Sequence, residues 1–250
     1  MKMMKTRMMK TKMMMSAMIM MWIMPVTAQV TTPLPAEEGS GVGLFLSADV
    51  VSQYVWRGLE CGSASLQPTL GLDYKGFSVS AWGSVGLVDT SDAKELDLTA
   101  SYTIGGLNLG ITDYWFNTPE ERYFLYDAHQ TSHVFEANIG YDFGPAAIQW
   151  YTNFAGNDGV NKDGDRAYSS YAEVSVPFKL ASVDWSAAVG AVPFATTSYG
   201  TNGFAVTNVS LKATKDIKVT DSFSIPIFGQ IAANPRTHKA YLVFGLTLQP

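Results

Sequence analysis

The sequence predicts an all-β fold, a transmembrane antiparallel up-and-down β-barrel of 12 strands. Apolar and polar residues alternate with a period of two along successive runs of the 250-residue chain, and this is the strand period. Short connections between the runs alternate with longer ones, as they do in membrane barrels. About 10 residues per run, at roughly 3.4 Å each and inclined by about 40°, rise about 25 Å, which is enough to cross the apolar part of a bilayer.

The N-terminus is set apart from the barrel by its composition. Residues 1–28 place five basic residues ahead of a largely apolar run at 13–24, and they end in small residues at Ala28. This layout is typical of a cleaved secretory signal peptide, with an uncleaved anchor as the alternative. Its removal takes five of the 17 basic residues and none of the 22 acidic ones, so the remaining chain has a net charge of −10. Such an acidic chain argues against nucleic acid as a partner.

Residues 29–43 are rich in Pro, Gly, Ser and Thr and show no period, so we expect a flexible periplasmic segment there. The barrel is expected over residues 44–250. Its clearest stretch is 66–87, where Leu70 and Leu72 share one parity, Gln67 and Asp73 share the other, and Lys75 begins a turn at Gly76. Two alternating runs joined in this way predict a β-hairpin.

The same alternation defines the other strands in order. The twelve predicted strands cover 44–56, 66–74, 77–87, 95–104, 107–116, 133–143, 146–154, 168–178, 183–191, 205–215, 222–231 and 238–248. The odd connections are predicted to be the longer, extracellular ones, chiefly the loops 117–132 and 155–166, and the first is a short loop at 58–63. Both termini should then lie on the periplasmic side.

Aromatic residues of the apolar parity fall near the predicted strand ends, among them Tyr54 and Trp56 at the outer end. Such residues would form the two interfacial girdles of a membrane barrel. A soluble sandwich or a lipocalin-like barrel is the alternative, because the apolar faces would then meet in a core.

The polar parity carries the residues that we expect to line the lumen. A barrel of this size has a backbone diameter of roughly 24 Å, which leaves roughly 12 Å between side chains. Acidic residues outnumber basic ones on this parity, so a water-filled lumen would favour cations. In the alternative, the charges pair across the lumen and fill it. The predicted lumen-lining residues are Asp49, Gln53, Arg57, Asp73, Trp82, Glu95, Asp97, Glu136, Asn138, Glu173, Lys212 and Lys239.

The three histidines, His129, His133 and His238, are the candidates for catalysis or metal binding. No serine lies in a recognisable nucleophile motif, and the i,i+4 spacing of His129 and His133 suits a metal site only on a helix, whereas the segment predicts a loop. We therefore expect that the protein is not an enzyme and that it has no catalytic residues, no bound metal and no cofactor. An outer-membrane hydrolase would require one of these histidines within hydrogen-bond reach of a Ser or an Asp.

Ser52, Tyr54, Arg57 and Gly58 form a Ser-x-Tyr-x-x-Arg-Gly run on the first predicted strand. It is followed by Gln67, the turn at Gly76, Trp82-Gly83-Ser84 and Glu95-Leu96-Asp97. Over residues 47–102 the sequence resembles the TorF-like porin family of bacterial outer-membrane proteins. The resemblance implies an outer-membrane β-barrel of unassigned substrate and brings no catalytic residues. The chain departs from many such barrels at its end, where Phe244 is the last aromatic residue.

These observations predict a bacterial outer-membrane porin with a narrow, cation-leaning channel for small solutes. Its expected partners are outer-membrane lipid, the barrel-assembly machinery and the solutes themselves. A non-conducting barrel with a structural role, or one that binds a partner through its long loops, is the alternative.

Overall fold

The computed structural model describes residues 41–250, apart from 90–91, 118–121, 128–129 and 222. The predicted signal peptide at 1–28 and most of the predicted flexible segment at 29–43 lie outside the described residues. None of the described residues belongs to a helix long and apolar enough to cross a membrane.

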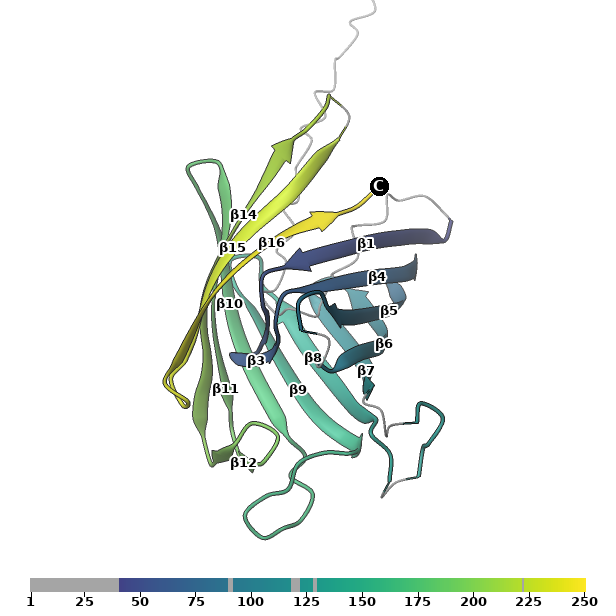
Figure 1. The fold of residues 1–250 in the computed structure, drawn as a ribbon, viewed down its shortest axis with the longest axis vertical. Coiled ribbons are helices and arrows are strands. Elements are labelled where there is room, and N and C mark those ends of the chain that lie inside the picture. Colours follow the sequence, from purple (N-terminus) through teal and green to yellow (C-terminus); the bar gives the residue numbers. More distant parts are fainter. Residues whose placement is uncertain (1–40, 90–91, 118–121, 128–129, 222) are drawn as a thin grey trace, which may run out of the picture.

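The predicted 12-stranded antiparallel barrel is confirmed (Figure 1). Its wall runs in the order β1, β4, β5, β6, β7, β8, β9, β10, β11, β14, β15 and β16, and β16 closes against β1. The barrel strands are β1 (Gly43–Val51), β4 (Ser65–Tyr74), β5 (Phe77–Gly86), β6 (Lys94–Ile104), β7 (Leu107–Asn117), β8 (Val134–Asp142), β9 (Ala147–Gly156), β10 (Ser170–Leu180), β11 (Val183–Val192), β14 (Ala205–Lys218), β15 (Ser224–Asn234) and β16 (Lys239–Leu248).

The predicted turn at Lys75 and Gly76 is also confirmed. Both residues have positive φ, at 48° and 87°, in the left-handed region required by the two-residue turn that joins β4 to β5. We call the end of the barrel with this turn the short-turn end. The opposite end, where residues 130–133 and the segment 157–169 lie, is the long-loop end (Figure 1).

The first predicted strand is wrong beyond residue 51. Val51 already pairs with Ser65 of β4, so β1 and β4 are adjacent there and the residues between them leave the barrel wall. Residues 52–64 instead form a separate two-stranded hairpin of β2 (Tyr54–Trp56) and β3 (Leu59–Gly62), which includes the segment predicted as a short loop at 58–63. We call residues 52–64 the inward hairpin, because its side chains lie inside the barrel.

Two further differences concern the connections. The segment after β11 contains a small hairpin of β12 (Ala195–Thr196) and β13 (Thr201–Asn202). The connection between β15 and β16 spans only residues 235–238 and is no longer than the one before it at 219–223, so the predicted alternation of connection lengths does not extend to the last pair.

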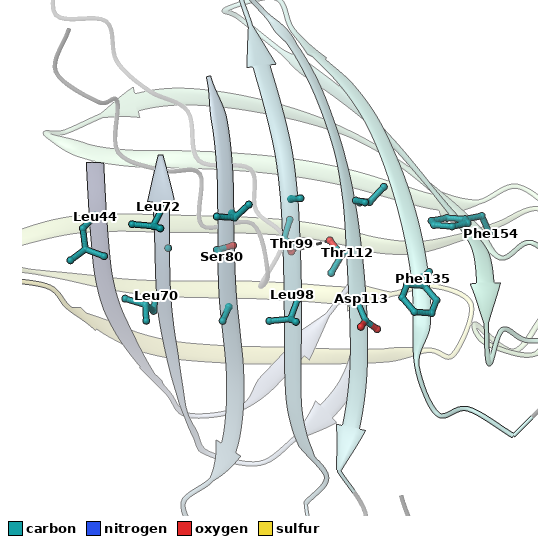
Figure 2. A pocket seen from close by; sticks show the side chains of 15 residues that line it. Leu44, Leu70, Leu72, Ser80, Leu98, Thr99, Thr112, Asp113, Phe135 and Phe154 are labelled. Atoms are coloured by element: carbon teal, nitrogen blue, oxygen red, sulfur yellow. Dashed lines mark hydrogen bonds between the residues drawn. The ribbon is translucent and has the colours of Figure 1, made fainter. Parts of the chain in front are cut away.

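The outer face of the barrel is apolar, as the alternation predicts. Leu70, Val79, Ile111 and Ile231 point outward and each is more than half exposed. A shallow apolar groove of about 600 Å³ runs along this face across β1 and β4–β9, and Figure 2 shows its lining from Leu44 to Phe154. A protein in water would bury such a surface, so this barrel presents its hydrophobic side to its surroundings.

Candidate functional site

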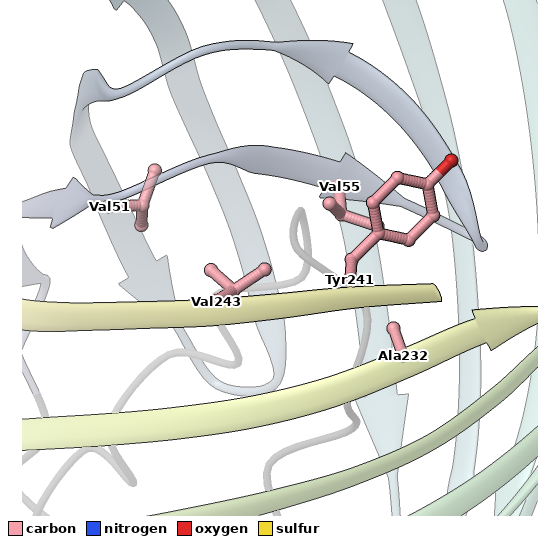
Figure 3. Close-up of a cluster of buried hydrophobic side chains, with 5 residues drawn as sticks. All are labelled: Val51, Val55, Ala232, Tyr241 and Val243. Atoms are coloured by element: carbon pink, nitrogen blue, oxygen red, sulfur yellow. The ribbon is translucent and has the colours of Figure 1, made fainter. Parts of the chain in front are cut away.

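The inward hairpin crosses the interior of the barrel. Val55 packs with Val51, Ala232, Tyr241 and Val243, which places one side of the hairpin against β15 and β16 (Figure 3). At the tip, the Asn234 side chain donates a hydrogen bond of 3.0 Å from Nδ2 to the Gly58 carbonyl.

The tip is a strained two-residue turn. Arg57 and Gly58 both have positive φ, at 48° and 79°, and Arg57 adopts a backbone conformation that is uncommon for a residue with a side chain. Only glycine fits at position 58, because a Cβ there would lie 1.9 Å from the Thr207 carbonyl oxygen on β14. The hairpin therefore holds Arg57 in a fixed position against the opposite wall.

Arg57 forms a buried, bidentate ion pair with Glu136 of β8. Its two terminal nitrogens lie 2.6 Å and 2.9 Å from the two carboxylate oxygens, and both side chains are almost completely inaccessible to solvent. The hydroxyl of Tyr199 accepts a further bond of 2.7 Å from Arg57, and the hydroxyl of Tyr114 donates one of 2.8 Å to Glu136. This geometry fixes the orientation of the guanidinium as well as its charge.

Aromatic rings surround the same guanidinium. Its Cζ lies 4.0 Å from the ring centre of Tyr151, 4.7 Å from that of Tyr171 and 4.3 Å from that of Trp56. Tyr199 stacks on Tyr171 and on Trp56, with ring centroids 6.1 Å and 5.9 Å apart. Three cation–π contacts in a site closed to water add to the attraction of the carboxylate.

The surroundings of the site fix the protonation states of Arg57 and Tyr199. Burial opposes the charge of Arg57, but the adjacent Glu136 outweighs it and raises the pKa of the guanidinium well above its ordinary value. Burial raises the pKa of the Tyr199 phenol. Arg57 is therefore a cation and Tyr199 a neutral hydroxyl at any physiological pH.

A second buried carboxylate, Glu173 of β10, lies beside the ion pair. It accepts hydrogen bonds from the hydroxyl of Tyr171 and, at 3.1 Å, from the side chain of Asn208. The barrel therefore places two carboxylates, those of Glu136 and Glu173, near the single positive charge of Arg57.

The opposite side of the inward hairpin faces another acidic region. Glu95 and Asp97 of β6 are buried there, and Tyr54 of the hairpin packs on Trp82 with ring centroids 5.6 Å apart. The predicted place of Tyr54 and Trp56 in an outer aromatic girdle is wrong, because both lie inside the barrel. Burial and the charge of Glu95 raise the pKa of the Cys61 thiol to about 12.

The half of the interior nearer the short-turn end is more open. Asp73 and Asn138 are partly exposed there, in contrast to Glu136, which is buried two residues before Asn138 on the same face of β8. Asp49, which lies between Gln67 of β4 and Thr247 of β16, and Lys212 of β14 are also partly exposed. Asp49 accepts a bond of 2.6 Å from Thr247, and Asn138 donates one of 2.9 Å to Asn108. The interior thus has a partly accessible polar half and a half that the inward hairpin fills.

Three predicted lumen residues differ in position from the rest: Arg57 is at the tip of the inward hairpin, and the other two are Gln53 and Lys239. Gln53 is on the inward hairpin and not on a barrel strand, and its side chain donates a bond of 2.8 Å to Glu60. Lys239 lies at the start of β16, at the long-loop end, with its side chain largely exposed and its ammonium 3.8 Å from Glu60.

His133 meets the requirement that the sequence sets for a hydrolase, since its Nδ1 lies 2.7 Å from Asp113. Its Nε2 donates to the Tyr123 carbonyl at 2.6 Å, so both ring nitrogens are engaged. The imidazole is fully buried and stacks on Trp115 and Tyr126. His238 lies exposed in the last turn, and His129 lies outside the described residues.

The residues predicted from the sequence do not include the aromatic part of the site. Tyr114, Tyr151 and Tyr171 occupy polar-parity positions on three strands, and aromatic residues on that parity are the signal that could have indicated a filled interior. Tyr199 comes from the β12–β13 segment, and no periodicity marks it.

Fold and interior together define a closed β-barrel that is apolar outside, polar inside and occluded in one half. No protein-family model matches the sequence, and no curated protein matches it. Among solved structures, the chain is similar to a porin with 17% identity and a TM-score of 0.37, over 77% of this chain and 63% of that one. It is also similar to an outer membrane channel from Pseudomonas putida F1 with 12% identity and a TM-score of 0.35, over 82% of this chain and 92% of that one. The chain spans about 63% of the porin's length.

Proposed function

We propose that this protein is a porin-like barrel of the bacterial outer membrane that forms a narrow channel for small solutes, with a preference for cations. The observation that carries the proposal is the distribution of side chains, which is the reverse of that in a water-soluble protein. Leu70, Val79 and Ile111 are exposed on the outer wall, whereas Glu136 and Glu173 lie inside. A wall of this kind is stable in hydrocarbon, which covers the apolar face and leaves the polar face to water or to other polar groups.

The polar half at the short-turn end supports a water-filled entrance. Asp73 and Asn138 are partly exposed there, and acidic side chains outnumber basic ones on the inner face, which gives the interior a negative potential. Such a potential concentrates cations and repels anions. The resemblance of residues 47–102 to the TorF-like porin family, and a secretory signal at 1–28, belong to the same proposal.

Recordings in planar bilayers on the refolded protein test this function. We expect discrete conductance steps, and across a gradient of potassium chloride a reversal potential of the sign given by a cation-selective pore. A folded barrel with no conductance above leak, in a preparation where a known porin conducts, would contradict the channel.

The second candidate is a non-conducting barrel, and the inward hairpin is the observation that favours it. Arg57 and the rings around it are buried at the level of Glu136, so the interior is filled there. A channel requires the hairpin to move. Bilayer recordings separate the two candidates, because a permanently filled barrel stays silent at every voltage.

A further inference from the structure

The guanidinium of Arg57 occupies a cage that is built by other parts of the chain. Glu136 supplies a carboxylate from β8, Tyr114 orients that carboxylate from β7, and Tyr151 and Tyr171 supply ring faces from β9 and β10. Tyr199 adds a hydroxyl acceptor from the β12–β13 segment. We call these five residues the cation cage. None of them belongs to the inward hairpin, so the cage is a property of the barrel and Arg57 is its occupant.

The chemistry of the cage is specific for a planar cation. Its two carboxylate oxygens lie 2.6 Å and 2.9 Å from two different nitrogens of the guanidinium, a fork that a spherical ammonium cannot reproduce. The ring centres of Tyr151 and Tyr171 lie 4.0 Å and 4.7 Å from the central carbon. Neutral urea-like groups share the shape but lack the charge that the carboxylate and the rings attract.

Arg57 itself is an imperfect occupant. Its Nε is buried and makes no hydrogen bond to any described residue, although its neighbours supply acceptors for the two terminal nitrogens. The turn that delivers it holds a side-chain-bearing residue at a φ of 48°. A strained backbone and an unsatisfied donor both favour release of the arginine when another cation can take its place.

We propose that the cation cage is a binding site for small organic cations that carry a guanidinium group, and that Arg57 is an internal ligand which such a solute displaces. Displacement frees the inward hairpin and opens the filled half of the interior. This inference deepens the proposed channel function and rests on it for the step from binding to passage. Glu173, which lies beside the cage and does not contact Arg57 directly, adds negative charge that retains the incoming cation.

The first test measures binding to the Arg57→Ala variant of the full chain. Methylguanidinium is the probe, and methylurea is the neutral control of nearly the same shape. We expect saturable binding of methylguanidinium by calorimetry, no binding of methylurea, and at least a tenfold weaker affinity in the double variant Arg57→Ala, Glu136→Gln. Absence of methylguanidinium binding to the folded single variant would overturn the inference.

The second test uses the wild-type chain, so it does not depend on the folding of a variant. Cys61 is the only cysteine, it lies on β3 of the inward hairpin, and its reaction with a maleimide reports movement of that hairpin. Millimolar methylguanidinium should raise the labelling rate at least threefold in a saturable manner, and methylurea at the same concentration should leave it unchanged. Equal rates with the two compounds would overturn displacement.

The two proposals fail in different ways. A barrel that binds methylguanidinium but never conducts leaves the cage as a cation site and refutes the channel. A barrel that conducts without binding the probe refutes the cage as a solute site and leaves the channel in place.

Discussion

Replacement of Arg57 by Ala tests the energetic role of the buried ion pair. The change removes the cation from the Glu136 carboxylate and leaves it inside the barrel, where the Tyr114 hydroxyl still donates a hydrogen bond to it. Loss of one member of a buried pair typically costs about 3–5 kcal/mol, because the other charge stays desolvated. The loss of three ring contacts, at roughly 0.5–2 kcal/mol each, acts in the same direction.

The measured effect has an upper limit set by the inward hairpin. If the hairpin leaves the interior, water reaches Glu136 and the penalty cannot exceed the free energy that holds the hairpin in place. We therefore expect urea unfolding of the refolded barrel, followed by tryptophan fluorescence, to show a loss of about 2–4 kcal/mol for Arg57→Ala.

A double-mutant cycle separates the pair from its surroundings. Glu136→Gln alone should destabilise the barrel by a similar amount, and the double variant Arg57→Ala, Glu136→Gln should be less destabilised than the sum of the two single variants by about 2 kcal/mol. Additive effects within about 0.5 kcal/mol would refute the reasoning that Arg57 and Glu136 stabilise the interior as a unit.

Three further predictions concern other parts of the chain. Gly58→Ala should displace the inward hairpin and speed maleimide labelling of Cys61, because its Cβ would meet the backbone of Thr207, whereas Gly164→Ala, which has a similar positive φ but open space, should leave labelling unchanged. The Cys61 thiol, with a pKa of about 12, is a weak acid that stays protonated at pH 8, so labelling of the native barrel should be far slower than that of the urea-unfolded chain and should rise steadily toward pH 11. Leu98→Arg on the outer wall should lower the stability of the bilayer-inserted barrel by about 2–4 kcal/mol in urea titrations, and an unchanged midpoint would argue against a lipid-facing position.

Alternation along the strands was sufficient to predict the barrel, because successive side chains on each strand of the wall face alternately outward and toward the interior. It could not show where the wall stops. Tyr54 and Trp56 continue the apolar parity of β1, so period alone extends the strand past Val51, where the pairing with Ser65 ends it.

A signal for the inward hairpin is nevertheless present in the sequence. Arg57-Gly58 has the same basic-glycine pattern as Lys75-Gly76, where the sequence predicts a turn, and both pairs adopt positive φ in the structure. Parity within a single strand marks both Arg57 and Glu136 as candidates for the lumen. Their contact joins residues 79 positions apart, and no local pattern specifies a pairing across the interior.

The central claim is that the inward hairpin closes the interior of the barrel, and removal of the hairpin tests it most directly. Val51 and Ser65 are paired neighbours, so residues 52–64 can be replaced by an Asn-Gly turn that keeps β1 and β4 in register. Single-channel recordings of this variant should show a larger and more persistently open conductance than the wild-type barrel. Equal conductance in the two folded proteins, or silence in both, would contradict a hairpin that gates a water-filled barrel.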